Sequence, residues 1–459
     1  EAAARGTAPG VGREAAARGT APVLPPSKAN PDITSDIESI RGKTLLMPSW
    51  DPFIGKLLEA VLRSEGVDAR LMPESEQTIR EGLSHNTGQC IPLNAVTQDC
   101  IAYIEREGRD PEKTALWMAE STLSCNIRMF PCYIKALLER HGKGLERTAV
   151  YLGDILFLDF SPRMGVTAYF AYMFGGYLRK LACKVRPYEK TRGMTDRVVA
   201  ESLDILYRLF LEKRFRKEGE ETVEKIVSKF LAVPTIPGRR PLVAIFGDLY
   251  VRDNDVMNQD LIRTIEEAGG EAIVTPYSEF IKAVSGPYFH RWFTEGKYVD
   301  VATTKVLMKL AVFLERKYRR LFNQVLREPD EFPELDPKTI LEYYHVRLDH
   351  TGESMENLMK TYYLKLLHPD ISLFIQASPA FCCASLVTKA MDERIEEVTG
   401  IPVLSIEYDG TGAFKNEDVI PYLKFPRKDR ADRAGRTVMS GGKETAVGGN
   451  PQQDSPFQT

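Results

Sequence analysis

Long apolar runs are missing from this chain, and so is a marked excess of charge of one sign. No apolar segment reaches the roughly 20 residues that a membrane-spanning helix needs. The N-terminal stretch is rich in Ala, Gly, Arg and Pro and lacks the apolar core of a secretory signal. The net charge of −3 argues against nucleic acid as the main partner. We therefore expect a protein that does not span a membrane, is not secreted and does not bind nucleic acid.

The common nucleotide motifs and the zinc-protease motif are missing as well. The tail sequence GGKET has neither the glycine spacing nor the preceding strand of a Walker A motif. No GxGxxG sequence follows a predicted strand, and no HExxH sequence occurs. These absences argue against ATP hydrolysis and against nicotinamide binding by this chain.

The cysteine content indicates thiols that serve as metal ligands or as buried apolar groups. The chain has 459 residues and 7 cysteines, whereas a secreted disulfide framework is usually short and even-numbered. Hydrophobic residues make up 43% and charged residues 27%, as is typical of globular proteins. We expect a cytoplasmic protein of at least two lobes, because one core rarely serves so long a chain.

Alternating strand and helix patterns predict an α/β fold with parallel sheets and crossover helices. The expected strands cover residues 44–48, 67–72, 114–120, 148–160, 241–248, 271–276, 373–376 and 403–406. The expected helices cover residues 53–65, 94–107, 131–140, 166–182, 194–231, 258–268, 301–326 and 384–398. The fold class that follows is two α/β lobes with an intervening helical segment.

Composition divides the chain into five parts. The stretch EAAARGTAP occurs at Glu1 and again at Glu14, which indicates a linker of short helical pieces and turns. Three prolines and a glycine in Leu231–Pro241 indicate a boundary between lobes. The expected parts are a flexible linker (1–42), an N-terminal lobe (43–190), a helical connector (191–238), a C-terminal lobe (239–427) and a disordered tail (428–459).

Cysteines occur at three strand-to-helix turns. Cys90 precedes a predicted helix, Cys125 follows the strand 114–120, and the pair Cys382 and Cys383 follows the strand beginning near Leu373. Such turns lie at the carboxyl ends of parallel strands, where ligands bind in open α/β sheets. A thiolate at a helix N-terminus is also favoured electrostatically. These four cysteines are therefore candidate metal or cluster ligands, and Cys132 in CNIRMFPC is a further candidate.

The alternative is that the cysteines are small buried apolar side chains. Cys183 fits this alternative well, and Cys100 fits it moderately. The chain lacks the paired CxxC sequences of structural zinc sites. Widely separated single cysteines suit an iron–sulfur cluster, with [4Fe–4S] as the expected type.

Polar residues follow two predicted strands of the second lobe. Tyr250 and Arg252 follow the strand 241–248, while Glu407 and Asp409 lie at the end of the strand 403–406. Side chains in these places can bind a substrate or act in acid–base catalysis. The alternative is that they form ordinary turns and helix caps.

Four blocks of the sequence carry a family resemblance. They are GQCIPLNAVTQD, SCNIRMFPCY, GDLYVRDNDVMNQDLIRTIEEAGGEAIVTPYSEFI and FCCASLVTKAMDERIEEVTGIPVLSIEYDGTGAFKNEDVIPYL. In this order they resemble the C-terminal part of the large CoA-substrate-specific enzyme activases, which is related to the 2-hydroxyacyl-CoA dehydratase subunits. The resemblance extends over residues 44–423.

The resemblance implies two flavodoxin-like lobes with an iron–sulfur cluster between them, either a [4Fe–4S] cluster or a double cubane at a dimer interface. It implies Cys90 and Cys125 as ligands from the first lobe, and Cys382 or Cys383 from the second. It also implies a separate ATP-hydrolysing activase of the actin/Hsp70-like fold as the electron donor, and a homodimer or a related α/β subunit. The expected function is an oxygen-sensitive electron-transfer, reductase or dehydratase component.

The chain departs from the family pattern in two respects. It lacks the ATPase segments of the full-length activases, and TLSCNIR stands where a GPCR-type sequence is usual. Two alternatives therefore stay open. One is a non-redox scaffold that docks the ATPase through structural or zinc-bound cysteines, and the other is a metal-free enzyme that uses Glu407 and Asp409.

Overall fold

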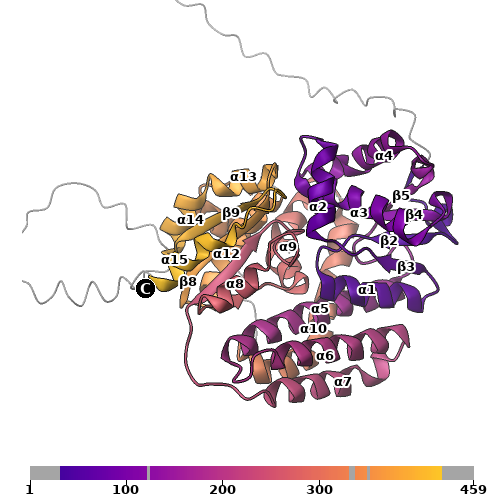
Figure 1. Cartoon of the computed structure of the whole chain (residues 1–459). Helices are drawn as coiled ribbons and strands as arrows, with labels where there is room; N and C mark the ends of the chain where they lie inside the picture. Colours follow the sequence, from indigo (N-terminus) through magenta and orange to yellow (C-terminus); the bar gives the residue numbers. More distant parts are fainter. Residues whose placement is uncertain (1–31, 121–124, 330–335, 349–351, 426–459) are drawn as a thin grey trace, which may run out of the picture. The chain divides into compact units, whose positions relative to one another are not determined.

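Residues 32–120, 125–329, 336–348 and 352–425 are described by the computed structural model. They contain two all-parallel β-sheets with a helical segment between them in the chain (Figure 1), which confirms the expected α/β fold class. Residues 1–31 of the predicted linker and the whole predicted tail (428–459) lie outside the described residues.

The N-terminal sheet has five strands in the order β1-β5-β4-β2-β3. Its strands are β1 (Ile33–Thr34), β2 (Thr44–Met47), β3 (Asp68–Leu71), β4 (Thr114–Ala119) and β5 (Ala149–Gly153). Apart from the short edge strand β1, the order is that of a flavodoxin-like sheet. Strand β3 lies on one side of β2, and β4 and β5 follow on the other side of β2. This reversal lies between β2 and β4.

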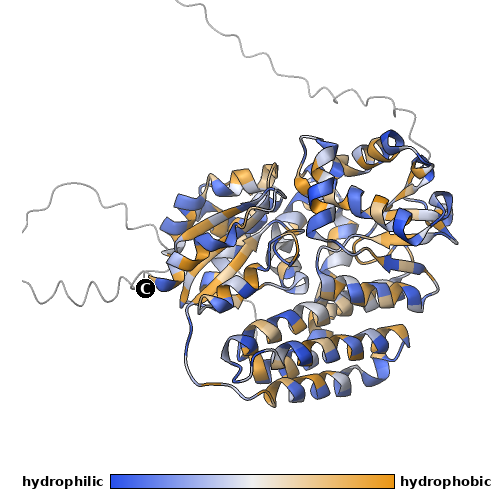
Figure 2. Cartoon of the chain, in the orientation of Figure 1, coloured by the Kyte–Doolittle hydropathy of each residue, from blue (hydrophilic) through white to orange (hydrophobic). Residues whose placement is uncertain are grey.

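The C-terminal sheet repeats that arrangement with four strands in the order β7-β6-β8-β9. Its strands are β6 (Leu242–Gly247), β7 (Glu271–Ile273), β8 (Ile371–Pro379) and β9 (Val403–Tyr408). The reversal lies between β6 and β8, so the carboxyl ends of these two strands flank the crevice where such sheets bind ligands. In Figure 2 the strands are mainly orange and the helices show both colours, since helices cover both faces of a parallel sheet.

Helices make up the rest of the described chain. Those of the first half are α1 (Pro52–Ser64), α2 (Glu76–Gly82), α3 (Ile91–Glu107), α4 (Phe130–His141), α5 (Pro162–Val185), α6 (Met194–Leu211) and α7 (Phe215–Leu231). Those of the second half are α8 (Leu261–Glu267), α9 (Tyr277–Thr294), α10 (Tyr298–Leu326), α11 (Pro337–Tyr343), α12 (Glu353–Leu367), α13 (Cys383–Lys389), α14 (Asp392–Thr399) and α15 (Val419–Lys424). None of these helices combines the length and apolarity needed to cross a bilayer.

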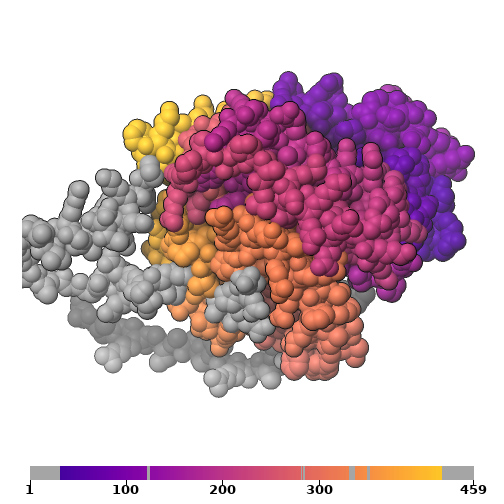
Figure 3. Space-filling view, turned by 90° about the horizontal axis from the view of Figure 1, so that it is seen from below, coloured from indigo at the N-terminus to yellow at the C-terminus, as the bar shows by residue number. Residues whose placement is uncertain are grey.

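The segment 194–231, for which the pattern predicts one long or a broken helix, forms two helices, α6 and α7. The chain turns between them at Lys213, whose φ of 56° cannot continue a right-handed helix. Helix α10 packs against α7 (Figure 3), and both pack against α5 through an aromatic cluster. Phe174 lies at its centre, with ring centroids 5.9 Å from Phe210 and 5.1 Å from Tyr318. The helical segment thus shares one core with the N-terminal sheet, since the same cluster contains Leu45 of β2 and Trp117 of β4.

Three predictions need correction. The strand expected over 148–160 ends at Gly153, because the Asp154 carboxylate accepts the Leu156 amide at 2.8 Å and starts a turn. The helix expected over 384–398 is broken into α13 and α14 around Met391. The expected flexible linker 1–42 is too long, since β1 pairs with β5 and the Val150 amide donates to Asp32 O.

Candidate functional site

One ionisable side chain follows the carboxyl end of β6 and another follows that of β8, and the two lie close together. Asp248 follows β6 directly, and Cys382 follows β8 after a short turn. The Cys382 Sγ lies 3.9 Å from Oδ2 of Asp248. Glu353, the first residue of α12, completes the group, and one ligand atom of each residue lies within 4.8 Å of the others. All three residues are buried.

Cys90 joins this group from the N-terminal lobe. It caps the N-terminus of α3 and is 6% exposed. The amide of the next residue, Ile91, donates to the carbonyl oxygen of Ala380 at 3.3 Å, which fastens the helix start to the turn after β8. The Cys90 thiol is a hydrogen-bond donor to Cys382, and this contact lowers the pKa of Cys382 despite its burial. The amide of Ser385 also stabilises the Cys382 thiolate.

Cys125 approaches from a third turn. It caps the short 3₁₀ helix Asn126–Met129 and is partly buried. Burial raises its pKa, and the charges of Glu353, Asp248 and Cys382 raise it further, so it lies within electrostatic reach of the site. The turns that carry Cys125 and Cys90 also touch, since Asn126 donates to Gln89 Oε1 at 3.3 Å. We call Cys90, Cys125, Asp248, Glu353 and Cys382 the cysteine–carboxylate site; among the described residues, Asp248, Glu353 and Cys382 form the group at mutual ligand distance.

Four of the five groups are shifted towards their neutral, protonated form. Burial raises the pKa of Asp248, and it raises that of Glu353 well above its ordinary range, with the Asp248 charge adding to the effect. The pKa of Cys90 is raised well above its ordinary value by the hydrogen bond to Cys382 and by burial. Such a set of acids is costly to ionise together unless a cation takes the place of the protons.

The remaining predicted cysteines point elsewhere. Cys383 is exposed, and its Sγ lies 3.1 Å from Oδ1 of Asn126. Cys132 is exposed on α4. Of the adjacent pair left open by the sequence, Cys382 faces the site. Within the described ranges the close group holds one cysteine and two carboxylates, rather than three cysteines at mutual ligand distance.

Tyr250 and Arg252 both lie close to the site, in the loop that begins with Asp248. The Tyr250 hydroxyl donates to Glu74 Oε2 at 2.7 Å, which connects the two lobes. Arg252 is 1% exposed, donates through Nε to Asp253 at 2.8 Å, and lies over the ring of Phe280 at 5.0 Å. Arg252 therefore lies in the interior of the C-terminal lobe, whereas Tyr250 is half-buried and reaches the N-terminal lobe.

Glu407 and Asp409 have local partners. Glu407 lies 3.7 Å from Lys389 Nζ at the end of β9. Asp409 accepts the Thr411 amide at 3.0 Å and pairs with Lys415 at 2.8 Å. Burial opposes the ionisation of Asp409, but these two contacts outweigh it and hold its pKa below the ordinary value. This geometry is that of a turn, and neither carboxylate belongs to the Asp248–Glu353–Cys382 group.

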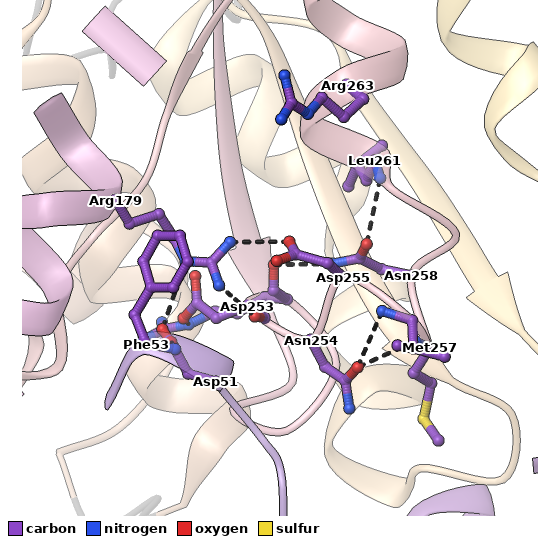
Figure 4. A network of polar contacts seen from close by, with 12 residues as sticks. Asp51, Phe53, Arg179, Asp253, Asn254, Asp255, Met257, Asn258, Leu261 and Arg263 are labelled. Atoms are coloured by element: carbon purple, nitrogen blue, oxygen red, sulfur yellow. Dashed lines mark hydrogen bonds and ion pairs between the residues drawn. The ribbon is translucent and has the colours of Figure 1, made fainter. Parts of the chain in front are cut away.

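A buried arginine connects the lobes close to the site (Figure 4). Arg179 of α5 donates to Oδ1 of Asp255 at 2.8 Å and to the carbonyl oxygen of Asp253 at 3.0 Å. Its Nε lies 3.4 Å from Asp51, the residue that caps α1. The loop after β2 is thereby held against the loop after β6. Because the two loops follow β2 and β6, this contact fixes the carboxyl ends of these strands relative to each other.

Asp248 and Glu353 were not predicted as site residues. The position of Asp248 could have indicated a site residue, because Asp248 directly follows a strand that ends in a glycine. Tyr250 and Arg252 lie in the same loop. The position of Glu353 gave no such indication, since it opens a helix that the sequence pattern did not predict.

No protein-family model and no curated protein matches this chain.

Proposed function

We propose that this protein holds an iron–sulfur cluster at the cysteine–carboxylate site and acts as an electron-transfer, reductase or dehydratase component. The observation that carries the proposal is that the turns with Cys90, Cys125 and Cys382 contact one another: Asn126 donates to Gln89 at 3.3 Å, and the Ile91 amide donates to the carbonyl oxygen of Ala380. Thiolates from a rigid scaffold are the usual ligands of such clusters, and burial tunes their potential. The cluster, when bound, accepts and donates single electrons at low potential.

The chemistry of the donors supports a cluster, because thiolates are its usual ligands. Three thiols from Cys90, Cys125 and Cys382 would bind it, and a [4Fe–4S] cluster has about four iron positions to be ligated. Asp248 and Glu353, which lie within ligand distance of Cys382, would supply an oxygen ligand or contact a substrate group. The raised pKa values of these two acids match this role, since a carboxyl group gives up its proton when a cation binds.

The protein's own residues perform three tasks in this proposal. The apolar cluster around Cys90 and Cys382 limits the access of water. The hydrogen bond from Cys90 and the Ser385 amide stabilise the Cys382 thiolate before any ligand binds. Tyr250, whose hydroxyl donates to Glu74, holds the N-terminal lobe against the loop that carries Asp248.

The resemblance of the sequence supports a separate ATP-hydrolysing activase of the actin/Hsp70-like fold as the source of electrons. A homodimer, or a complex with a related α/β subunit, is part of the same proposal, and a double cubane is the form that such a dimer would hold. All seven cysteines are free thiols. We propose a cytoplasmic, oxygen-sensitive protein, because a reducing compartment preserves free thiols.

The test is anaerobic purification followed by iron, acid-labile sulfide and zinc analysis, with electron paramagnetic resonance after dithionite reduction. We expect about four irons per chain and a reduced-cluster signal. Cys125→Ala is expected to lose the brown colour and most of the iron. Cys183→Ala is the matched control, because Cys183 is buried in a different core cluster with α8 and β6. A full iron complement in Cys125→Ala would refute the proposal.

A single zinc ion is the second candidate. Asp248, Glu353 and Cys382 already lie within 4.8 Å of one another, and zinc accepts mixed sulfur and oxygen ligands. One zinc per chain without sulfide would favour the non-redox scaffold that docks an ATPase.

A further inference from the structure

The first half of helix α10 exposes most of its apolar residues instead of burying them. Val301 is buried there. The exposed apolar side chains are Val299 (76%), Val306 (66%), Leu307 (51%), Leu310 (50%) and Phe313 (67%). With about 3.6 residues per turn, Val299 and Leu310 lie on the side of the helix opposite Val301. Exposed apolar residues that form a continuous row, rather than scattered single positions, indicate a contact site.

The row has the spacing of a coiled-coil contact. Val299, Val306 and Phe313 lie seven residues apart. Thr303 and Leu310 each follow four residues after one of these positions. Alternating steps of four and three residues keep a single narrow row directed at a partner helix. We call these five exposed residues the α10 seam (Val299, Thr303, Val306, Leu310 and Phe313).

An exposed aromatic pair adjoins the N-terminal end of the seam. Phe293 near the end of α9 is 59% exposed, and Tyr298 at the start of α10 is 58% exposed. Their ring centroids lie 5.0 Å apart. Aromatic side chains are enriched at protein interfaces, so this pair extends the contact surface to the turn between α9 and α10.

Basic residues lie along one flank of the seam. The exposed residues on this flank are Lys305, Lys309, Arg316 and Arg320. Residues 301–320 contain a single acidic residue, Glu315, which is buried and pairs with Lys282 at 2.7 Å. The flank therefore has a positive potential, and a partner with acidic residues beside its apolar row complements it.

Charge and shape argue against other occupants of the seam. A second copy of α10 brings no exposed acidic residue from the segment 301–320 to the basic flank. Residues 1–31 and 426–459 of this chain each contain more basic than acidic residues, so neither provides an acidic partner. A helix that lies on a bilayer presents a broad apolar face, whereas the seam is one narrow row. A helix of a different protein fits best.

We propose that the α10 seam binds an amphipathic, acidic helix of a partner protein. Leu or Ile side chains of that helix pack between Val299, Val306 and Phe313. Its Asp or Glu residues lie beside Lys305 and Lys309. The seam spans about 21 Å, which suits a short helix and a reversible contact. Helix α10 contributes no residue to the cysteine–carboxylate site, so this inference goes beyond the proposed function.

The test measures the binding of two synthetic peptides to the full-length protein by fluorescence anisotropy. Both peptides are helices of about four heptads with Ile and Leu in the apolar row, and one has Glu on its flanks where the other has Lys. The like charges on each peptide oppose its pairing with itself. We expect micromolar binding of the Glu peptide and at least about tenfold weaker binding of the Lys peptide.

Leu310→Glu is expected to weaken binding of the Glu peptide by at least about tenfold, because it places a like charge within the seam. Leu386→Glu is the matched control, since Leu386 lies on α13 and is 55% exposed. Both positions are on the surface, so both variants should stay folded, and thermal unfolding checks this. The double substitution Lys305→Glu and Lys309→Glu is expected to reverse the preference from the Glu peptide to the Lys peptide.

Equal binding of the two peptides, no binding of the Glu peptide, or unchanged binding in Leu310→Glu would each overturn the proposal. Analytical ultracentrifugation without peptide tests a second copy as the occupant, and co-sedimentation with phosphatidylserine vesicles tests a membrane. Self-association or vesicle binding that Leu310→Glu abolishes would also overturn the proposal. Iron content is measured on the same samples and is expected to be equal in all of them, so failure of the cluster proposal is distinguishable.

Discussion

The Sγ of Cys382 lies 3.9 Å from Oδ2 of Asp248, although 134 residues separate them in the chain. Both follow strands that are neighbours in the C-terminal sheet, β8 and β6. The adjacent Cys383 is exposed and contacts Asn126 instead. Two consecutive cysteines therefore have different surroundings, and this difference can be tested.

Cys382→Ser is expected to lose most of the bound metal, whereas Cys383→Ser should retain it. The reason is that Cys382 shares the site with Asp248 and Glu353, and a hydroxyl is a much weaker ligand than a thiolate. Metal analysis of the two purified variants, together with thermal unfolding, is the measurement. Equal metal content in both variants would contradict the assignment of Cys382 as the inward-facing ligand.

Arg179→Met is expected to destabilise the protein by about 3–5 kcal/mol, because it leaves buried carboxylates without their partner. Arg179 is 4% exposed and contacts Asp51 and Asp255 on different lobes. Denaturant unfolding measures the change. Arg192→Met is the control, since the Arg192 side chain is 89% exposed in its pair with Glu267 and should change stability by less than about 0.5 kcal/mol. Similar losses of stability in both variants would show that the buried ion pairs of Arg179 contribute no more than an exposed ion pair.

The protein should become less stable as the pH rises from about 4 to 8, on the order of 2 kcal/mol from one carboxyl pair. Burial raises the pKa of Glu74 to about 7 and that of Asp99 to about 8, with the Glu74 charge adding to the shift of Asp99. In this range the folded protein binds more protons than the unfolded chain, so the free energy of unfolding falls with pH.

Glu74→Gln should flatten that pH dependence, because an amide does not titrate. Glu74 accepts hydrogen bonds from Tyr250 at 2.7 Å and from Asn254 at 2.6 Å, so the effect reports on the contact between the lobes. Urea unfolding at several pH values is the measurement. The exposed Glu76→Gln serves as the control, and the same slope in all three proteins would count against the buried pair.

Gly247→Ala is expected to cost more than about 2 kcal/mol. Its φ is 120°, and an added Cβ would come within 2.2 Å of the Ala377 carbonyl oxygen on β8. The substitution should also reduce metal binding, because Asp248 follows directly. Gly42→Ala is the control: its φ is 77° with nothing within 4 Å, so a cost near 1 kcal/mol is expected. Thermal unfolding and metal analysis of both variants decide the matter.

Much of the fold could be predicted because its signals are local. The apolar runs that become β2, β4 and β6 are continuous, as expected for strands covered on both faces. Errors arose where a local feature interrupts a pattern. The Asp154 turn ends β5 early, and the predicted helix 384–398 is broken around Met391. The polar sequence of α12 gave no sign of a buried helix, because its burial depends on distant elements.

The sequence alone predicts most of the strands and many of the helices, and it places Cys90, Cys125 and Cys382 at turns beside strand ends, since these follow from periodicity and chain order. Which side chains meet depends on packing between segments far apart in the chain. Only the tertiary structure shows that Cys382 rather than Cys383 faces Asp248, and that Glu353 completes the group. The surrounding core decides which of two neighbouring side chains at a helix start faces inward. That core is built from residues distant in the chain, so a local sequence pattern does not reveal it.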